Sequence, residues 1–177
     1  MLFRRRVVKK LSFRHILIDE INRRGNIDTK ILIEKMRKIV KKDSEVIKKF
    51  KEYGVPIDEI DNVFISFCEL PVSAKTKDMK IYLNEKMLES DLISDPTHYL
   101  VHELVHYLQQ RTGKNNGVEQ KNEDYLDRPS EEEAFESQVD FKRRKESPEE
   151  ANRYVEDLLD YHGFEGREKK EKKEDIL

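Results

Sequence analysis

Cysteine is almost absent from this 177-residue chain, in which Cys68 is the only one. A single cysteine excludes an internal disulfide, and such a chain is typical of a reducing, intracellular compartment. The sequence also lacks any run of 18 apolar residues, so we expect no membrane-spanning helix. Its first ten residues carry the positive charge of a signal peptide, but Arg14 and His15 interrupt the apolar stretch that should follow. We therefore predict a cytoplasmic protein.

Net charge is also small, although charged residues are abundant. Asp, Glu, Lys and Arg make up 41% of the chain and hydrophobic residues 36%, yet the formal net charge is only −2. Positive and negative side chains are therefore interspersed over a solvated surface, and charge alone does not indicate a nucleic-acid-binding protein. The composition is rich in Lys, Glu and Ile and poor in Ala and Gln. This balance is typical of heat-adapted proteins, and also of proteins encoded by AT-rich DNA. The length suits one domain with its own core.

One segment carries residues typical of catalytic chemistry, His102-Glu103-Leu-Val-His106. On a helix, residues four apart lie one above the other, so both imidazoles can bind one metal ion while Glu103 reaches a water on that ion. A helix is expected here because Pro96 suits its first turn and Gly113 suits its C-terminal cap. The alternative is that both histidines are packing residues that share this register by chance.

A catalytic zinc ion needs a third protein ligand beside the two histidines. No histidine follows at the H-E-x-x-H-x-x-G-x-x-H spacing, so carboxylates are the remaining candidates. Residues 127–136 open a second predicted helix that contains three consecutive glutamates. Counting by three and four from Glu131 reaches the mainly apolar stripe that must face the protein, whereas the same count from Glu133 reaches polar residues. We therefore predict Glu131 as the third ligand, Glu132 as the alternative, and Glu133 as a capping residue paired with Ser130.

These two helices together resemble the gluzincin metallopeptidases, in which a His-Glu-x-x-His helix is followed by Glu-x-x-Ala on a second helix. The phrase Pro129-Ser-Glu-Glu-Glu-Ala134 is similar to the Glu-x-Glu-Ala segment of ImmA/IrrE-like intracellular and phage-borne members, and the resemblance covers about residues 60 to 145. It implies an α+β, zincin-like minimal metallopeptidase domain with additional N-terminal and C-terminal helices. In this domain a small mixed sheet packs on the metal helix, the helix that carries His102, Glu103 and His106. Gluzincins often carry Asp or Asn directly after that alanine to support a metal histidine. This chain has Phe135 there, and Gln138 or Glu136 can substitute.

The resemblance also implies a mechanism, the hydrolysis of peptide bonds in a peptide or protein substrate by a zinc-dependent endopeptidase. Zinc held by the two histidines and Glu131 lowers the pKa of a bound water towards about 7 and polarises the scissile carbonyl. Glu103 takes the proton of that water and passes it to the leaving amine. Tyr125 and His98 are the two suggestive positions for a donor to the oxyanion, and for each of them a structural role is the preferred interpretation.

Two segments before the metal helix alternate apolar and polar residues and are predicted strands, residues 62–68 and 80–84. Residues 71–77 between them are predicted to form a polar loop. In the families that this chain resembles, the strand just before the metal helix borders the cleft and pairs with an extended substrate. Residues 80–84 would take that place. The alternative is a plain hairpin of a small sheet.

The first 54 residues are predicted to form a basic N-terminal segment and a helical region packed on the core. A short helix is expected over residues 11–22, and a long one from Thr29 to Tyr53 that Asp28 caps. Apolar residues recur along the long helix at spacings of three and four residues. They form a narrow apolar stripe, which favours packing on the sheet or on a neighbouring helix over a separate coiled coil.

The metallopeptidase core with its C-terminal helices is predicted to occupy residues 55–163. Its last helix begins at the capping box Ser147-Pro-Glu-Glu150. Residues 164–177 show no apolar periodicity and are predicted to form a charged, mobile tail.

Three functions agree with these patterns. The first is an intracellular zinc endopeptidase. The second is a peptidase recruited to DNA, in the manner of SprT-like proteases, because residues 1–14 carry six positive charges and no acid. A merely solvated terminus is the alternative explanation of that charge. The third is a non-catalytic zincin-fold binding or regulatory module, against which Glu103 argues because a purely structural metal site has no use for a base.

Overall fold

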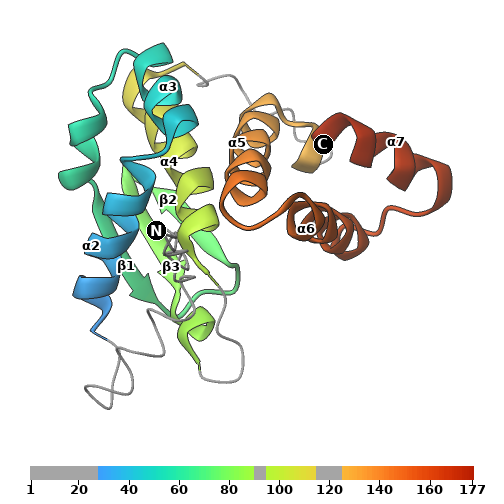
Figure 1. Cartoon of the computed structure of the whole chain (residues 1–177), viewed down its shortest axis with the longest axis horizontal. Helices are drawn as coiled ribbons and strands as arrows, with labels where there is room; N and C mark the ends of the chain where they lie inside the picture. Colours follow the sequence, from blue (N-terminus) through green and yellow to red (C-terminus); the bar gives the residue numbers. More distant parts are fainter. Residues whose placement is uncertain (1–27, 90–94, 115–124) are drawn as a thin grey trace, which may run out of the picture.

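The computed structural model describes residues 28–89, 95–114 and 125–177. In these parts of the chain, six α-helices accompany a three-stranded mixed sheet, so the fold is α+β as predicted (Figure 1). The elements run in the order α2 (Thr29–Val40), α3 (Ser44–Glu52), η1 (Ile57–Asp61), β1 (Phe64–Cys68), β2 (Ala74–Lys77), β3 (Lys80–Asn84), η2 (Glu85–Leu88), α4 (Thr97–Thr112), η3 (Tyr125–Asp127), α5 (Pro129–Lys145), α6 (Pro148–Tyr161) and α7 (Gly166–Ile176).

The sheet has the strand order β1-β3-β2, which makes β3 its central strand. β1 pairs with β3 in parallel and β2 pairs with β3 antiparallel, so that both Ile65 and Thr76 lie opposite Ile81. The prediction that residues 80–84 form a cleft-bordering strand free to pair with substrate is wrong, because both edges of β3 are already occupied. Among the described strands, the edge strand that contacts α4 is β2 instead.

β2 lies in the segment that the sequence predicts to be a polar loop. Lys75 and Lys77 are exposed, whereas Ala74 and Thr76 are only half-buried. With small or polar residues on its inner side, the strand lacks the apolar alternation by which strands are recognised. Pairing with β3, and not the local sequence, makes this segment a strand.

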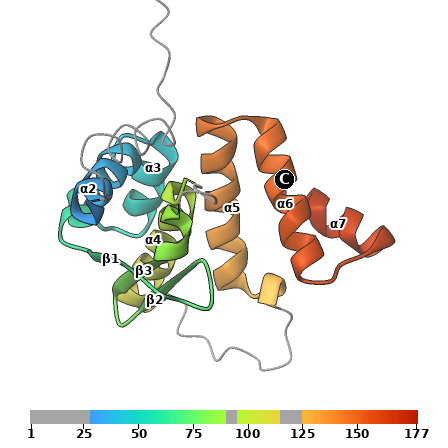
Figure 2. The ribbon, with the colours of Figure 1, turned by 90° about the horizontal axis from the view of Figure 1, so that it is seen from below.

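α2 and α4 cover one face of the sheet, as Figures 1 and 2 both show. Ile65, Ile81 and Leu83 point to these helices and are between 0% and 8% exposed. They join the first of two apolar clusters, which also takes in residues of α2, α3 and α4. No helix within the described ranges is long and apolar enough to cross a membrane.

α2 and α3 are separate helices, not the single helix predicted from Thr29 to Tyr53. The chain breaks before Asp43, whose side chain accepts hydrogen bonds from two amides in the first turn of α3. The Asp43 carboxylate is 2% exposed and also pairs with Arg144 and Lys145 at the end of α5. The predicted cap of the first helix, Asp28, is confirmed.

α6 and α7 lie on the far side of α5 from the sheet (Figures 1 and 2). Ser147 caps α6 as predicted. α7 occupies the segment that the sequence predicts to be a mobile tail, and none of its side chains is buried. Its lysines Lys172 and Lys173 pair with Asp127 and Glu156, and its half-buried Ile176 packs against the second apolar cluster, so these contacts hold it where apolar periodicity is missing. The second apolar cluster joins η3, α5 and α6 and consists of Leu126, Phe135, Val139, Ala151, Val155, Leu159 and Phe164.

The predicted short helix over residues 11–22 and the basic cluster of residues 1–14 lie outside the described residues. The proposed DNA recruitment through that cluster therefore stays a prediction.

Candidate metal centre

α4 places the two histidines of the motif on one face. Just before the helix, the side chain of Asp95 accepts a 2.8 Å hydrogen bond from the amide of Thr97, and Gly113 ends the helix in the left-handed conformation, as predicted. The Nε2 atoms of His102 and His106 lie 3.1 Å apart. Residues four apart on a regular helix meet in this way, so the local sequence is sufficient to bring the pair together.

α5 brings a carboxylate to the same point. Oε2 of Glu131 lies 3.3 Å from Nε2 of His102 and 3.3 Å from Nε2 of His106. One candidate ligand atom from each of the three residues lies within 4.8 Å of the others. Glu131 is 8% exposed, whereas the alternative candidate Glu132 is exposed to solvent. We call His102, His106 and Glu131 the metal cluster.

The metal cluster is a strongly coupled acid–base group. Burial raises the pKa of Glu131, but the close imidazoles of His102 and His106 outweigh it and hold that pKa well below its usual range. Burial lowers the pKa of His106, but Glu131 and the nearby charge of Glu103 raise it to about 9. A metal ion must therefore displace a proton from His106 to bind at neutral pH.

Two buried atoms of the cluster have no hydrogen-bond partner among the described residues, Oε2 of Glu131 and Nδ1 of His102. The 3.3 Å contacts of Oε2 with the imidazoles lack hydrogen-bond geometry. An unpaired buried carboxylate oxygen is costly unless a cation or donor compensates it. Two imidazoles and one carboxylate are also the donor set of many catalytic zinc sites. The residues present therefore fit a zinc ion.

Glu103, the residue after His102, is 5% exposed and receives a hydrogen bond from another element. Oγ1 of Thr76, on β2, lies 2.7 Å from Oε2 of Glu103 and 3.0 Å from the Glu103 carbonyl oxygen. This contact ties the carboxylate to the sheet and restricts its rotamers. Sequence reasoning missed Thr76 because β2 was taken for a loop.

Gln109 holds His106 from the side opposite Glu131. Its Oε1 lies 2.9 Å from Nδ1 of His106, and its Nε2 donates to the carbonyl oxygen of Ser130 at 3.1 Å and to Oε2 of Glu133 at 3.0 Å. The predicted capping box of Ser130 and Glu133 is wrong, since no side chain caps α5. The only signal in the sequence was the position of Gln109 three residues after His106, on the same side of the helix.

Neither Gln138 nor Glu136, the two predicted supports of a metal histidine, hydrogen-bonds to His102. Gln138 lies 2.8 Å from Nδ1 of His98 instead, and Glu136 is exposed. At the departure from the gluzincin pattern, the ring of Phe135 packs against the ring of His102, with centroids 4.6 Å apart and planes at 65°. Aromatic packing, and not a hydrogen bond, therefore orients His102.

Of the two candidates for an oxyanion donor, only Tyr125 adjoins the metal cluster. Burial and the charges of Glu131 and Glu103 raise the pKa of Tyr125 well above its usual range, so its hydroxyl stays protonated and able to donate. His98 is buried against Tyr99 and Tyr154, with ring centroids 4.1 and 5.2 Å away. Burial holds the pKa of His98 well below its usual value, and its imidazole belongs to the interior.

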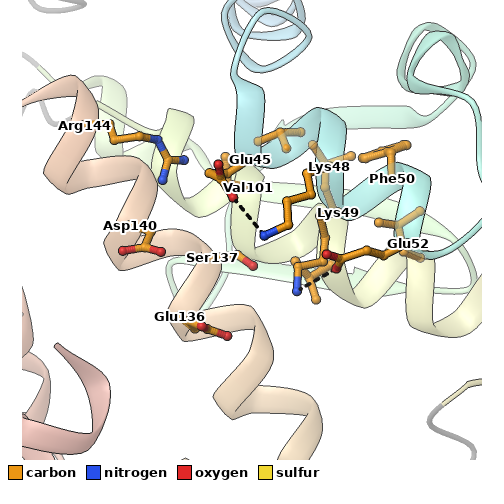
Figure 3. A pocket seen from close by; sticks show the side chains of 14 residues that line it. Glu45, Lys48, Lys49, Phe50, Glu52, Val101, Glu136, Ser137, Asp140 and Arg144 are labelled. Atoms are coloured by element: carbon orange, nitrogen blue, oxygen red, sulfur yellow. Dashed lines mark ion pairs between the residues drawn. The ribbon is translucent and has the colours of Figure 1, made fainter.

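A groove of about 140 Å³ lies apart from the metal cluster, between α3, α4 and α5 (Figure 3). Val101, Leu104 and Leu108 line it together with charged side chains of α3 and α5, and no residue of the metal cluster borders it. Figure 3 shows Lys49 of α3 among its charged side chains. The groove is therefore not part of the proposed centre.

Comparisons of the chain with protein-family models, with curated proteins and with solved structures found no match. The functional argument consequently depends on the residues of the metal cluster and on what surrounds them.

Proposed function

We propose that this protein is a zinc-dependent metalloendopeptidase of the gluzincin type on a zincin-like fold. His102, His106 and Glu131 would hold the zinc ion, and Glu103 would act as general base. The observation that carries the proposal is the meeting of α4 and α5, where three side chains of metal-ligating type converge beside a buried glutamate. Packing alone gives no reason to bury a carboxylate between two imidazoles.

The donor set favours a catalytic metal over a structural one. Structural zinc sites close their shell with four protein ligands, whereas catalytic sites keep three and leave a position for water. The described residues supply three at this point. Glu103 stands directly beside them, and a structural site needs no such base. These features argue against the non-catalytic module.

When bound, zinc supplies a Lewis acid for the scissile carbonyl and lowers the pKa of a water to about 7. Glu103, held by the Thr76 hydroxyl, would accept a proton from that water at its carboxylate and pass it to the leaving amine. The hydroxyl of Tyr125, which the nearby charges of Glu131 and Glu103 help to keep protonated, would donate to the developing oxyanion.

An extended peptide is the substrate form that suits this site. β2 is an edge strand, and its Thr76 contacts Glu103. A peptide that pairs along the free edge of β2 would run past the metal cluster, with main-chain hydrogen bonds supplying affinity.

Zinc content tests the metal site. We expect one equivalent of zinc in the wild type, none in His102→Ala, and weakened binding in Glu131→Gln. Glu132→Gln is the matched control, because the exposed neighbouring glutamate does not reach the histidines. A wild-type protein that binds no zinc would overturn the proposal.

Turnover of labelled casein or a peptide library tests the base. Glu103→Gln should abolish hydrolysis and leave zinc content unchanged, because an amide cannot accept the proton. A zinc-loaded wild type that cleaves neither substrate would instead support the non-catalytic module.

A further inference from the structure

Behind His106, a chain of hydrogen bonds leads away from the metal cluster to α3. We propose that Gln109 is a positioning residue that fixes the tautomer of His106, and that Glu133, Tyr53 and Lys49 keep the Gln109 amide in the one orientation that does so. This inference rests on the proposed zinc site. It adds to that site the residues on which its metal affinity depends.

The orientation of the Gln109 amide follows from its acceptors. Nε2 faces two oxygens, the Ser130 carbonyl at 3.1 Å and Oε2 of Glu133 at 3.0 Å. A flipped amide would turn Oε1 towards both acceptors and lose two hydrogen bonds. Oε1 therefore faces Nδ1 of His106, 2.9 Å away. Because an amide oxygen only accepts, Nδ1 carries a hydrogen, and the neutral form of His106 that binds metal presents the lone pair of Nε2 to the other residues of the metal cluster.

Glu133 keeps this arrangement in place because donors surround its carboxylate. The Tyr53 hydroxyl lies 2.5 Å from Oε2, and Nζ of Lys49 lies 3.1 Å from Oε1. An ionised carboxylate accepts and cannot donate, so it can face only the amide nitrogen of Gln109.

The two metal histidines are supported unequally. His106 has the Gln109 hydrogen bond, whereas Nδ1 of His102 has no partner within the described ranges and its ring is held by Phe135. Removing the Gln109 amide would leave neither imidazole with a hydrogen bond at Nδ1 from the described residues. The affinity for metal should therefore be sensitive to this one side chain.

The first test compares two neighbouring glutamines. Gln109→Leu should weaken zinc binding about 10- to 100-fold, the usual effect of losing a hydrogen-bond partner behind a metal ligand. Gln110→Leu is the matched control. Gln110 is exposed and bonds to the β2–β3 turn through the amide of Met79, so its loss should leave the zinc affinity unchanged. Dissociation constants are measured by competition with a chromogenic chelator, and folding of each metal-free variant is checked by circular dichroism.

The second test uses charge. Gln109→Glu keeps an acceptor for His106 but places a second carboxylate against Glu133, and it should bind zinc at least about tenfold more weakly. Adding Glu133→Gln restores a donor opposite that new carboxylate. The double variant should recover most of the lost affinity. A contribution of Gln109 to packing alone would not produce this rescue.

The outcomes separate the inference from the proposed function. A folded Gln109→Leu variant that binds zinc as tightly as the wild type would overturn the positioning role and leave the zinc site intact, and so would a double variant that shows no recovery. Absence of zinc binding in the wild type would overturn the proposed function, and the inference with it.

Discussion

The carboxylate of Glu103 is oriented by a single hydroxyl from another element. Thr76 donates to it across 2.7 Å from the edge strand β2. A hydrogen bond to a charged acceptor contributes about 1.5–3 kcal/mol. Without this bond, the buried carboxylate would lose a compensating donor and gain rotamers, and it would occupy the position of a general base for less of the time.

Thr76→Val should therefore lower kcat/KM about tenfold or more, since tenfold corresponds to about 1.4 kcal/mol in the transition state. Zinc content should not change, because Thr76 contacts no residue of the metal cluster. Thr76→Ser keeps the hydroxyl and should retain most of the activity. Equal activity in Thr76→Val and the wild type would contradict a positioning role for this hydroxyl.

At the scale of the elements, one carboxylate both separates α2 from α3 and anchors α5. Asp43 caps α3 and pairs with Arg144 and Lys145 at the last turn of α5. An N-cap contributes about 0.5–2 kcal/mol, and pairs with partly exposed cations add about 0–1 kcal/mol each. Asp43 thus joins segments that lie a hundred residues apart.

Asp43→Ala should lower the free energy of unfolding by about 2 kcal/mol, because both the cap and the ion pairs are lost. Asp43→Asn keeps a capping oxygen and should cost about half as much. Urea denaturation followed by circular dichroism measures both. Identical losses in the two variants would show that the cap contributes nothing.

The same residue predicts a dependence on pH. Burial raises the pKa of Asp43, but Arg144, Lys145 and the amide of Val46 bring it below its usual value of 3.8. Because the folded pKa is lower than the unfolded one, ionised Asp43 stabilises the fold above about pH 4, and this contribution is lost as the pH falls through the folded pKa. The difference in unfolding free energy between wild type and Asp43→Asn should be constant at neutral pH and shrink below about pH 4. A difference that grows on acidification would contradict this assignment.

For the whole molecule, the important boundary lies between α4 and α5. One apolar cluster includes the sheet, α4 and Phe141 of α5, the other joins α5 to α6, and the residues of the metal cluster come from α4 and α5. α4 supplies two of its residues and α5 the third. A bound metal ion would therefore add a further link between these two packed helices.

Chelation should accordingly lower the melting temperature of the wild type. A ligand that binds only the folded state adds about 2.7 kcal/mol of stability at a free concentration of 100 times its Kd. Differential scanning calorimetry with zinc and with EDTA measures the difference. His102→Ala should melt at the same temperature in both conditions, and a wild type that is indifferent to EDTA would contradict metal binding.

The sequence by itself determined what depends on neighbours along the chain. His102 and His106 meet because helical residues four apart share a face, and Asp28 and Ser147 cap helices through amides two or three residues ahead. The prediction that Glu131 points inward is confirmed for the same reason, since the apolar stripe of α5 decides which glutamate faces the protein.

Only the tertiary structure decided what depends on distant partners. β2 is a strand because β3 lies beside it, and α7 is held by ion pairs and by the packing of Ile176, which its sequence does not predict because it lacks apolar periodicity. The partners of Glu133 come from α3 and α4, and they turn an expected cap into the support of a metal histidine. The physical reason is one of range. Helical periodicity and capping act over a single turn, whereas a polar side chain is satisfied by whichever donor or acceptor the folded chain brings to it.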